Sequence, residues 1–267
     1  MSDDQVVLVA AEESRSLWAI SPGPSQGIDR QIKTSERIAS AIVGLVVDQG
    51  LKEGDRLPNE TEMIEQFRVG RGSLREALRI LETYGLISLR SGPGGGPVIL
   101  NVSPADVSRS FSLYLRLSGA TIQELVDARK VIDPLMARLA ADNITGESAQ
   151  RLRDALVREE EAAQDKTTVV ATANDFHYVL ASITGNSVLN LVATSLKEMY
   201  TSRFVMIGLA EQVTKPSIRK EHKKIGEAVL LGDGALAERL MREHANKHFD
   251  QALRASPSFS NSVITWG

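Results

Sequence analysis

The sequence predicts a mainly α-helical fold in two parts: an N-terminal unit of three helices with a small β-hairpin, and a C-terminal all-α bundle of about six or seven helices. Apolar residues recur at helical spacing along most of the chain, which is the primary signal for amphipathic helices. Only residues 86–100 carry two short β-prone runs, separated by glycines and prolines. A length of 267 residues, with 42% hydrophobic and 24% charged residues, suits two ordinary globular domains.

The composition excludes several classes of protein. The chain has no cysteine, which excludes disulfides, thiolate metal sites and cysteine nucleophiles. No stretch approaches the roughly 18 to 20 apolar residues that span a bilayer. The first residues, Met1 to Asp4, are acidic where a secretory signal is basic. We therefore expect a soluble, cytoplasmic protein with no membrane partner.

Breaks in the apolar pattern predict four segments. These are a mobile N-terminal arm over 1–30, the helix-and-hairpin unit over 31–101, the helical bundle over 102–256 and a C-terminal tail over 257–267. The arm holds five acidic and two basic residues, so it accounts for the net charge of −3. The remainder of the chain is balanced, and a basic patch within it can still face an acidic partner.

The first unit begins with a helix over 34–49, where apolar residues follow helical spacing and Gly50 suits a C-terminal stop. Asn59 and Glu62 have the spacing of a capping pair and open a short second helix. After a turn, a third helix over about 71–84 carries a narrow apolar stripe. The stripe consists of Leu74, Ala77, Leu78 and Leu81.

Residues 86–90 and 98–100 predict a hairpin whose tip is the glycine- and proline-rich stretch between them. Three helices followed by a hairpin within about 70 residues is the order of a winged helix-turn-helix. A phosphate-binding loop is the alternative for the glycines at 92–96. That loop needs a following helix and a lysine, whereas here a strand without lysine follows. We therefore interpret the hairpin as a wing.

Arg71, Arg75 and Arg79 lie four residues apart, so they share the face of the third helix that is turned away from the leucine stripe. Within 68–90, five arginines stand against two glutamates. The major groove of DNA accommodates one helix. An arginine side chain can donate two hydrogen bonds to guanine or bind a phosphate. The alternative is a solvated arginine face without a ligand, which the position after a turn and before a hairpin disfavours.

The first unit resembles the GntR family of bacterial repressors, and the resemblance covers about 34–100. It rests on Leu57-Pro58-Asn59-Glu60-x-Glu62 and on Val69-Gly70-Arg71-x-Ser73-Leu74-Arg75-Glu76-Ala77-Leu78-Arg79-x-Leu81-Glu82-x-x-Gly85-Leu86. The resemblance implies that Arg71, Gly72, Ser73 and Arg75 start the recognition helix. It also implies that Ser91 and Gly92 lie at a wing tip near the minor groove. The implied partner is a double-stranded DNA operator.

Two positions depart from the family pattern. Gly70 stands where relatives usually have Ser or Thr, so a cap is kept but a side-chain contact to phosphate is lost. Thr61 stands where relatives often have arginine, which removes one expected contact to DNA.

The second unit is expected to hold helices near 104–118, 121–144, 147–164, 167–184, 187–212, 216–231 and 234–255. All four histidines lie on these helices: His177, His222, His244 and His248. Imidazoles that converge from different helices can hold zinc, nickel or a related ion. The alternative for each histidine alone is a surface or core residue.

The bundle resembles the FCD ligand-binding domain of the FadR-like GntR branch over about 105–253. The motifs are Asp127-x-Arg129, Asp133-Pro134, Phe176-His177, Gly185-Asn186, Glu221-His222, Gly232-Asp233 and Met241-Arg242-x-His244. The resemblance implies that His177, His222 and His244 hold a divalent metal ion, with a carboxylate four residues before the first. That position is Ala173 here, so the fourth ligand is either Asn174 or a water or effector. His248 matches no ligand position, and we interpret it as a surface or second-shell residue.

Arg129 is the candidate for binding an acidic effector, because relatives have a pocket arginine here and a guanidinium pairs with carboxylates. The alternative is a helix-surface salt bridge with Asp127 or Asp133. Together these features predict a homodimeric, effector-responsive repressor that binds a pseudo-palindromic operator and a small carboxylate.

Two other functions stay open from the sequence. A metal-free pocket for an acyl-CoA is supported by Ala173 and opposed by the three histidines. A metal-dependent hydrolase needs a general base beside an open ligand position. Glu221 is next to His222 but turned about 100° away on the helix. We therefore expect no enzymatic activity.

Overall fold

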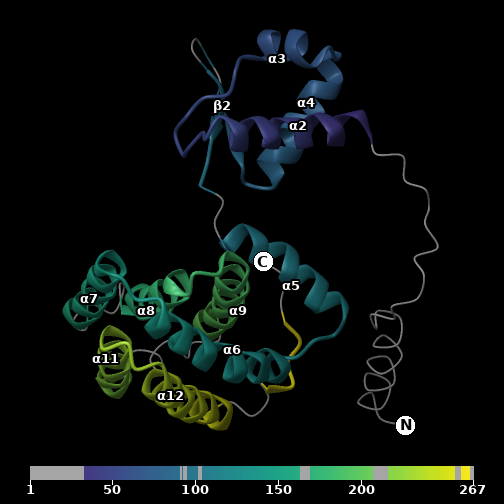
Figure 1. The fold of residues 1–267 in the computed structure, drawn as a ribbon. Coiled ribbons are helices and arrows are strands. Elements are labelled where there is room, and N and C mark those ends of the chain that lie inside the picture. Colours follow the sequence, from purple (N-terminus) through teal and green to yellow (C-terminus); the bar gives the residue numbers. More distant parts are fainter. Residues whose placement is uncertain are drawn as a thin grey trace, which may run out of the picture. The chain divides into compact units, whose positions relative to one another are not determined.

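The computed structural model describes residues 33–90, 92, 95–101, 104–162, 169–206, 216–255 and 260–264 (Figure 1). They divide into two compact units, one that ends at Asp106 and one that begins at Val107. The expected arm over 1–30 lies outside the described residues. No helix of the described ranges is long and apolar enough to cross a membrane.

The first unit holds three helices and a two-stranded antiparallel sheet, as the sequence predicted. The elements are α2 (Thr34–Asp48), α3 (Glu60–Phe67), α4 (Arg71–Thr83), β1 (Ile87–Arg90) and β2 (Gly96–Ile99). Asn59 accepts hydrogen bonds from the backbone of Thr61 and Glu62, and the Glu62 carboxylate accepts one from Asn59 N–H. The predicted capping box therefore starts α3.

Helix α4 forms the centre of this unit. The four residues of its predicted apolar stripe are all at most 4% exposed, and they pack against Ile38, Ile42 and Met63. Because the stripe is narrow, the opposite face of α4 is left to solvent. Gly70 caps the helix through its backbone conformation, without a side-chain hydrogen bond.

The hairpin pairs Ile87 with Ile99 and Arg90 with Gly96. At its tip, Gly92 has φ +99°, a conformation that favours glycine, and its carbonyl accepts a hydrogen bond from Gly95 N–H at 2.8 Å. Arg56 forms an isolated antiparallel bridge to Val98, which adds a third segment that the sequence pattern did not predict.

The second unit contains seven helices among its described residues. They are α5 (Pro104–Leu117), α6 (Ile122–Asp142), α7 (Gly146–Glu161), α8 (Val169–Ile183), α9 (Ser187–Met206), α11 (Pro216–Leu230) and α12 (Gly234–Ala255). Helix α6 contacts α8, α9, α11 and α12, so it runs through the middle of the bundle (Figure 1). The last expected residues of 187–212 lie outside the described ranges.

Two large apolar clusters and a smaller one around Met136, Ala181 and Ala193 fill the bundle. One of the large clusters contains Val126, Tyr200 and Phe249, and the other contains Phe176, Leu180, Val229 and Met241. Polar side chains are buried between the helices that carry these clusters, and they form the site described below.

A short segment near the C-terminus packs onto the bundle. The Ile122 N–H donates to the Ser262 carbonyl at 3.0 Å, and the Ile264 N–H donates to the Ala120 carbonyl at 2.9 Å. The Ile264 side chain is only 3% exposed. Residues 260–264, which the sequence assigned to a tail, are therefore part of the packed structure.

Candidate functional site

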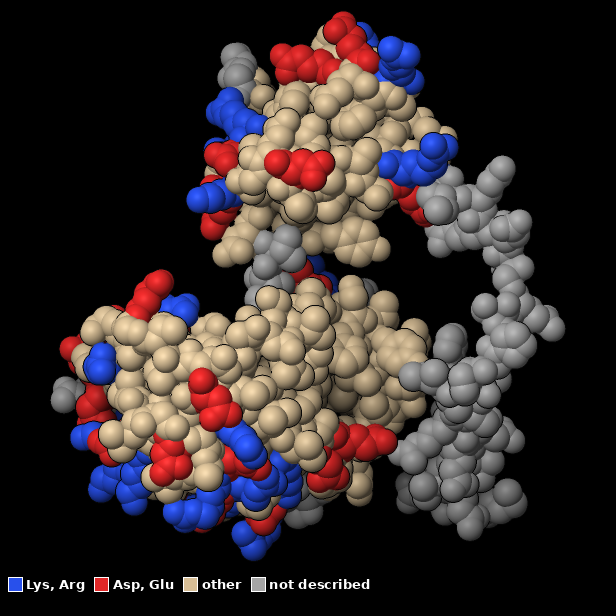
Figure 2. All heavy atoms as spheres, in the orientation of Figure 1, with Lys and Arg blue, Asp and Glu red and all other residues tan. Residues whose placement is uncertain are grey.

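The structure exposes the side chains that the sequence assigned to DNA on α4. Arg71, Arg75 and Arg79 are all exposed, as is Gly72, whereas Ser73 is half-buried. The first unit carries basic side chains on its surface, interspersed with acidic ones (Figure 2). At the wing, Gly92 is exposed, and Ser91 lies outside the described residues.

Arg75 has a partner within the protein. Its Nε lies 3.1 Å from Oε2 of Glu60 at the start of α3, and the two side chains are 66% and 42% exposed. An ion pair this exposed contributes at most about 1 kcal/mol. A phosphate or a guanine edge can therefore replace Glu60 as the partner of Arg75 at little cost.

In the bundle, three histidines from three helices converge. His177 comes from α8, His222 from α11 and His244 from α12, and one ligand atom from each lies within 4.8 Å of the others. The ring centroids of His177 and His222 are 5.0 Å apart, and those of His222 and His244 are 4.8 Å apart. The set that the family resemblance implied is therefore brought together.

Two carboxylates fix the orientation of two of these rings. Nδ1 of His222 lies 2.8 Å from Oε1 of the buried Glu159 on α7. Nδ1 of His244 lies 2.8 Å from Oε2 of Glu221, which also accepts a hydrogen bond from Lys247. Metal-bound histidines usually have such a carboxylate partner on the outer nitrogen. Glu159 was missed by the sequence reasoning.

The inner nitrogens have the spacing that a metal ion requires. Nε2 of His222 and Nε2 of His244 are 3.3 Å apart. Two nitrogens at about 2.05 Å from a tetrahedral zinc are separated by about 3.3 Å. In the tautomers in which each Nδ1 donates to its carboxylate, the two Nε2 lone pairs face each other, and a cation between them stabilises this arrangement. The residues present therefore fit a divalent ion.

Burial keeps the histidines neutral. It lowers the pKa of His222 to about 3 and that of His244 to about 4, and it holds the pKa of His177 well below its usual value. Burial raises the pKa of Glu159 to about 7. In contrast, the hydrogen bond from His244 lowers the pKa of Glu221 to about 2. Neutral imidazoles are the form that binds metals.

These shifts predict a dependence of stability on pH in the metal-free protein. Below pH 6.5 the unfolded chain protonates its histidines, whereas the folded chain does not, so stability decreases as the pH falls. Each buried histidine contributes up to about 1.4 kcal/mol per pH unit. The raised pKa of Glu159 acts in the opposite direction between pH 4.5 and 7, but burial also lowers the pKa of His248, so one carboxyl group stands against four histidines.

We therefore expect a lower urea midpoint at pH 5.5 than at pH 7 when chelator is present. The variant His222→Phe is the control, because it removes one titrating ring, keeps a ring against Phe176 and leaves the opposing carboxylate in place. Its midpoint is expected to vary less with pH. An equal or higher midpoint at pH 5.5 in the unmodified chain contradicts the prediction.

Arg129 forms the salt bridge with Asp133 that the sequence offered as an alternative, but the pair lies inside the bundle and not on the helix surface. The residue is 2% exposed, and its Nη2 donates to Oδ2 of Asp133 at 2.6 Å. The guanidinium lies over the rings of Tyr200 and Phe249, with centroid distances of 4.8 Å and 4.9 Å. Asp127, the other suggested partner, is exposed and accepts a hydrogen bond from Gln123.

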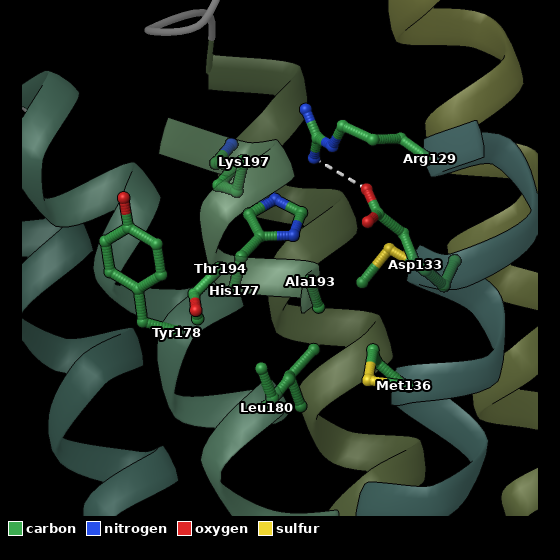
Figure 3. A pocket seen from close by; sticks show the side chains of 11 residues that line it. Arg129, Asp133, Met136, His177, Tyr178, Leu180, Ala193, Thr194 and Lys197 are labelled. Atoms are coloured by element: carbon green, nitrogen blue, oxygen red, sulfur yellow. Dashed lines mark hydrogen bonds and ion pairs between the residues drawn. The ribbon is translucent and has the colours of Figure 1, made fainter. Parts of the chain in front are cut away.

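A cavity of about 240 Å³ is lined by His244 together with Glu221 and Lys247. Two small cavities of about 10 Å³ and 20 Å³ lie on the side of the histidines that faces Arg129. Arg129, Asp133, His177 and Lys197 line both small cavities, and Figure 3 shows these side chains. The larger of the two small cavities is also lined by His222, His244 and His248. Each small cavity has space for about one water molecule or ion.

His248 and Asn174 differ in their relation to this site. His248 is half-buried, lies parallel to His244 at 5.9 Å and lines the larger of the two small cavities, so it is not a surface residue. Oδ1 of Asn174 accepts a hydrogen bond from Thr201 Oγ1 at 3.1 Å, and Asn174 lines neither small cavity. The side chain of Ala173 lies outside the described residues.

The structure offers no support for a general base. Glu221 is engaged by the outer nitrogen of His244 and by Lys247, so it does not lie beside the inner nitrogens where a metal-bound water would be activated. The arrangement is suited to binding a ligand rather than to hydrolysis.

Comparison with known proteins agrees with both halves of this description. Residues 34–95 match the gntR family of bacterial regulatory proteins, and residues 124–247 match the FCD domain. The chain is similar to an HTH-type transcriptional regulator of Mycobacterium tuberculosis, with 33% identity over 236 residues that cover 86% of this chain and 93% of the relative.

Two further similarities extend the comparison. The HTH-type transcriptional regulator LutR of Bacillus subtilis is 29% identical over 199 residues, which cover 73% of this chain and 90% of LutR. Among solved structures, the GntR protein of Streptococcus agalactiae has a TM-score of 0.62 at 24% identity, covering 83% of this chain and 100% of that one. The structural likeness concerns the fold.

Proposed function

The chain belongs to the GntR family of bacterial transcriptional regulators and carries an FCD domain, and from this premise we propose that it is a metal-containing repressor of the FadR-like branch that responds to a small carboxylate. It is a DNA-binding regulator and not an enzyme. Its place of action is the bacterial cytoplasm, where the DNA lies.

For DNA, the proposal assigns direct contacts to the start of α4. Arg71, Gly72, Ser73 and Arg75 enter the major groove, and Ser91 and Gly92 bring the wing to the minor groove. A homodimer places two such units on the halves of a pseudo-palindromic operator. The exposure of the three α4 arginines supports this assignment, because an arginine held in the core could not reach a base.

For the bundle, the single observation that carries the proposal is the 3.3 Å approach of two imidazole nitrogens whose outer nitrogens both meet carboxylates. We assign His177, His222 and His244 as ligands of a divalent ion, with zinc or nickel as the best candidates for nitrogen donors. Asn174 or a water completes the set. The bound ion supplies a Lewis-acidic position at which an acid can bind.

Arg129 is assigned to the effector. Its Nε and Nη1 have no hydrogen-bond partner among the described residues, whereas Nη2 is held by Asp133. The rings of Tyr200 and Phe249, whose centroids are 5.0 Å apart, both contact the guanidinium from one side and help to keep it in place. A carboxylate at the ion could therefore accept a hydrogen bond from Nε or from Nη1, which point to different sides of the guanidinium, without rearrangement of the arginine.

The second candidate is a metal-free pocket that binds an acyl-CoA, which Ala173 favours because it removes an anionic ligand. The small cavities at Arg129 favour the small acid instead, since an acyl chain needs a far larger opening. The cavity of about 240 Å³ is large enough for part of a chain, but most of its lining residues are charged, namely Glu221, Lys224, Glu243 and Lys247.

A titration separates the two candidates. The chain is loaded with zinc or treated with chelator, and its thermal midpoint is measured with a panel of short carboxylates and with a long-chain acyl-CoA. Stabilisation by a short acid in the zinc-loaded form alone supports the proposal. Stabilisation by acyl-CoA in both forms, with no response to short acids, contradicts it.

A further inference from the structure

Lys197 is a buried cation that the proposed function does not use. It lies on α9, is 8% exposed and lines both small cavities beside the histidines. Among the described residues, no carboxylate lies within 4.0 Å of its ammonium group. Burial, followed by the charge of Arg129, lowers its pKa to about 7. A buried ammonium without a partner is costly unless a ligand supplies one.

Arg129 and Lys197 together make the cavity wall cationic. They lie on either side of the His177 ring in Figure 3, one from α6 and the other from α9. Arg129 keeps two N–H groups without a hydrogen-bond partner among the described residues. Two separate cationic groups thus face the space beside the proposed ion.

The charged groups around this space are the proposed ion, two basic side chains and nearby carboxylates. The ion would bring two positive charges, and Arg129 and Lys197 bring one each when protonated. Asp133 pairs with Arg129 and Glu159 with His222, whereas Glu198 acts on Lys197 from a distance and accepts a hydrogen bond from Tyr178. Glu221 is already shared with Lys247 at the surface. Lys197 is therefore the cationic group of this wall that no carboxylate contacts among the described residues, and the low dielectric of the interior makes an uncontacted charge there unfavourable.

We propose that the pocket takes a small dicarboxylate, with one carboxylate at the ion and Arg129 and the other on Lys197. The inference rests on the proposed metal site and narrows its ligand from an acid to a dianion. A dicarboxylate suits the arrangement because its two charged ends are separated, as are the two cations. Each small cavity alone holds about one water molecule, so the ligand requires the two to join at the side chains that line both, Arg129, His177 and Lys197. A phosphate places its charge on one centre and reaches one of them.

The experiment is calorimetric titration of the zinc-loaded full-length chain. Malonate, succinate and glutarate are compared with propionate, butyrate and valerate, which match them in chain length, and with inorganic phosphate. Zinc content is measured after each titration, so that chelation is not mistaken for binding. We expect at least one dicarboxylate to bind about tenfold more tightly than its matched monocarboxylate.

Variants assign the difference to one side chain. Lys197→Met keeps the length and removes the charge, and it is expected to lose most of the tenfold preference while monocarboxylate affinity stays within about threefold. Lys197→Arg is expected to keep part of the preference. Lys223→Met is the matched control, because Lys223 is an exposed lysine on α11, and it is expected to behave as the unmodified chain.

Three results overturn the inference. They are equal affinity for dicarboxylates and monocarboxylates in the unmodified chain, equal weakening of both by Lys197→Met, and tighter binding of phosphate than of every dicarboxylate. The first and third do not depend on the folding of a variant.

Affinity for DNA, measured in parallel, separates this inference from the proposed function. A dicarboxylate preference with no effect on DNA binding supports the inference and contradicts effector control. A change in DNA affinity that only monocarboxylates cause supports effector control and contradicts the inference.

Discussion

Arg71→Ala and Arg75→Ala are each expected to abolish operator-specific DNA binding while leaving the fold and the oligomeric state unchanged. Both side chains are exposed on α4, so their removal creates no cavity. A forked arginine contact to guanine contributes about 1–3 kcal/mol of discrimination, and the two half-sites of a dimer double the loss. Affinity should therefore fall to the level measured for unrelated duplexes.

The measurement uses a duplex that the unmodified chain selects from a random-sequence pool, at one fixed salt concentration, because phosphate contacts are strongly salt-dependent. Arg153→Ala is the matched control, since Arg153 is an exposed arginine on α7, and it should retain full affinity. Unchanged affinity in both α4 variants would remove the recognition-helix assignment.

His177→Ala is expected to eliminate the bound metal. The unmodified chain, purified without chelator, should contain about one ion per chain by elemental analysis. Its thermal midpoint should fall when chelator is added, because an ion present at a thousandfold over its Kd adds about 4 kcal/mol of stability. In His177→Ala both the ion and this response should be lost.

His248→Ala is the matched control for the metal prediction. His248 lines the same cavity and lies parallel to His244, but it does not belong to the set of converging ligand atoms. The variant should keep its ion. Absence of metal in the unmodified chain, even after incubation with zinc or nickel, would favour the acyl-CoA alternative. Loss of the ion in His248→Ala instead of His177→Ala would overturn the ligand assignment.

The helices and the hairpin could be predicted from the sequence because their signals are local. The apolar stripe of α4, the capping pair at Asn59 and Glu62 and the glycine-rich wing each depend on residues a few positions apart. The bridge between Arg56 and Val98 and the packing of Ile264 could not be predicted, since they join segments that are distant in the sequence.

The candidate metal site was predicted only in part, because its residues lie on helices that are distant in the sequence. The three histidines followed from a family resemblance, not from spacing, because they lie on separate helices. Glu159 sits within a run of charged residues that is typical of a solvated surface, although it falls on the stripe of Leu152 and Ala155, where α7 meets α11. A charged residue on an apolar stripe was the signal that could have found it.

Lys197 and Arg129 show the limit of local reasoning about charge. Residues 193–201 of α9 are all buried or half-buried, so a lysine at position 197 has no solvated face to occupy. Arg129 has an acidic residue four positions later, which is typical of a surface pair, yet the pair is buried. Burial, which decides the role of both residues, depends on helices that pack from other parts of the chain.

The central claim is that occupation of the histidine pocket controls the reading of DNA. Its most direct test is the affinity of the zinc-loaded chain for the selected duplex, measured with and without a saturating acid from the panel. Control by the pocket predicts that the affinity changes by at least about fivefold, and that His177→Ala no longer responds to the acid. An acid that binds the pocket with no change in duplex affinity, or an equal change in His177→Ala, would contradict the claim.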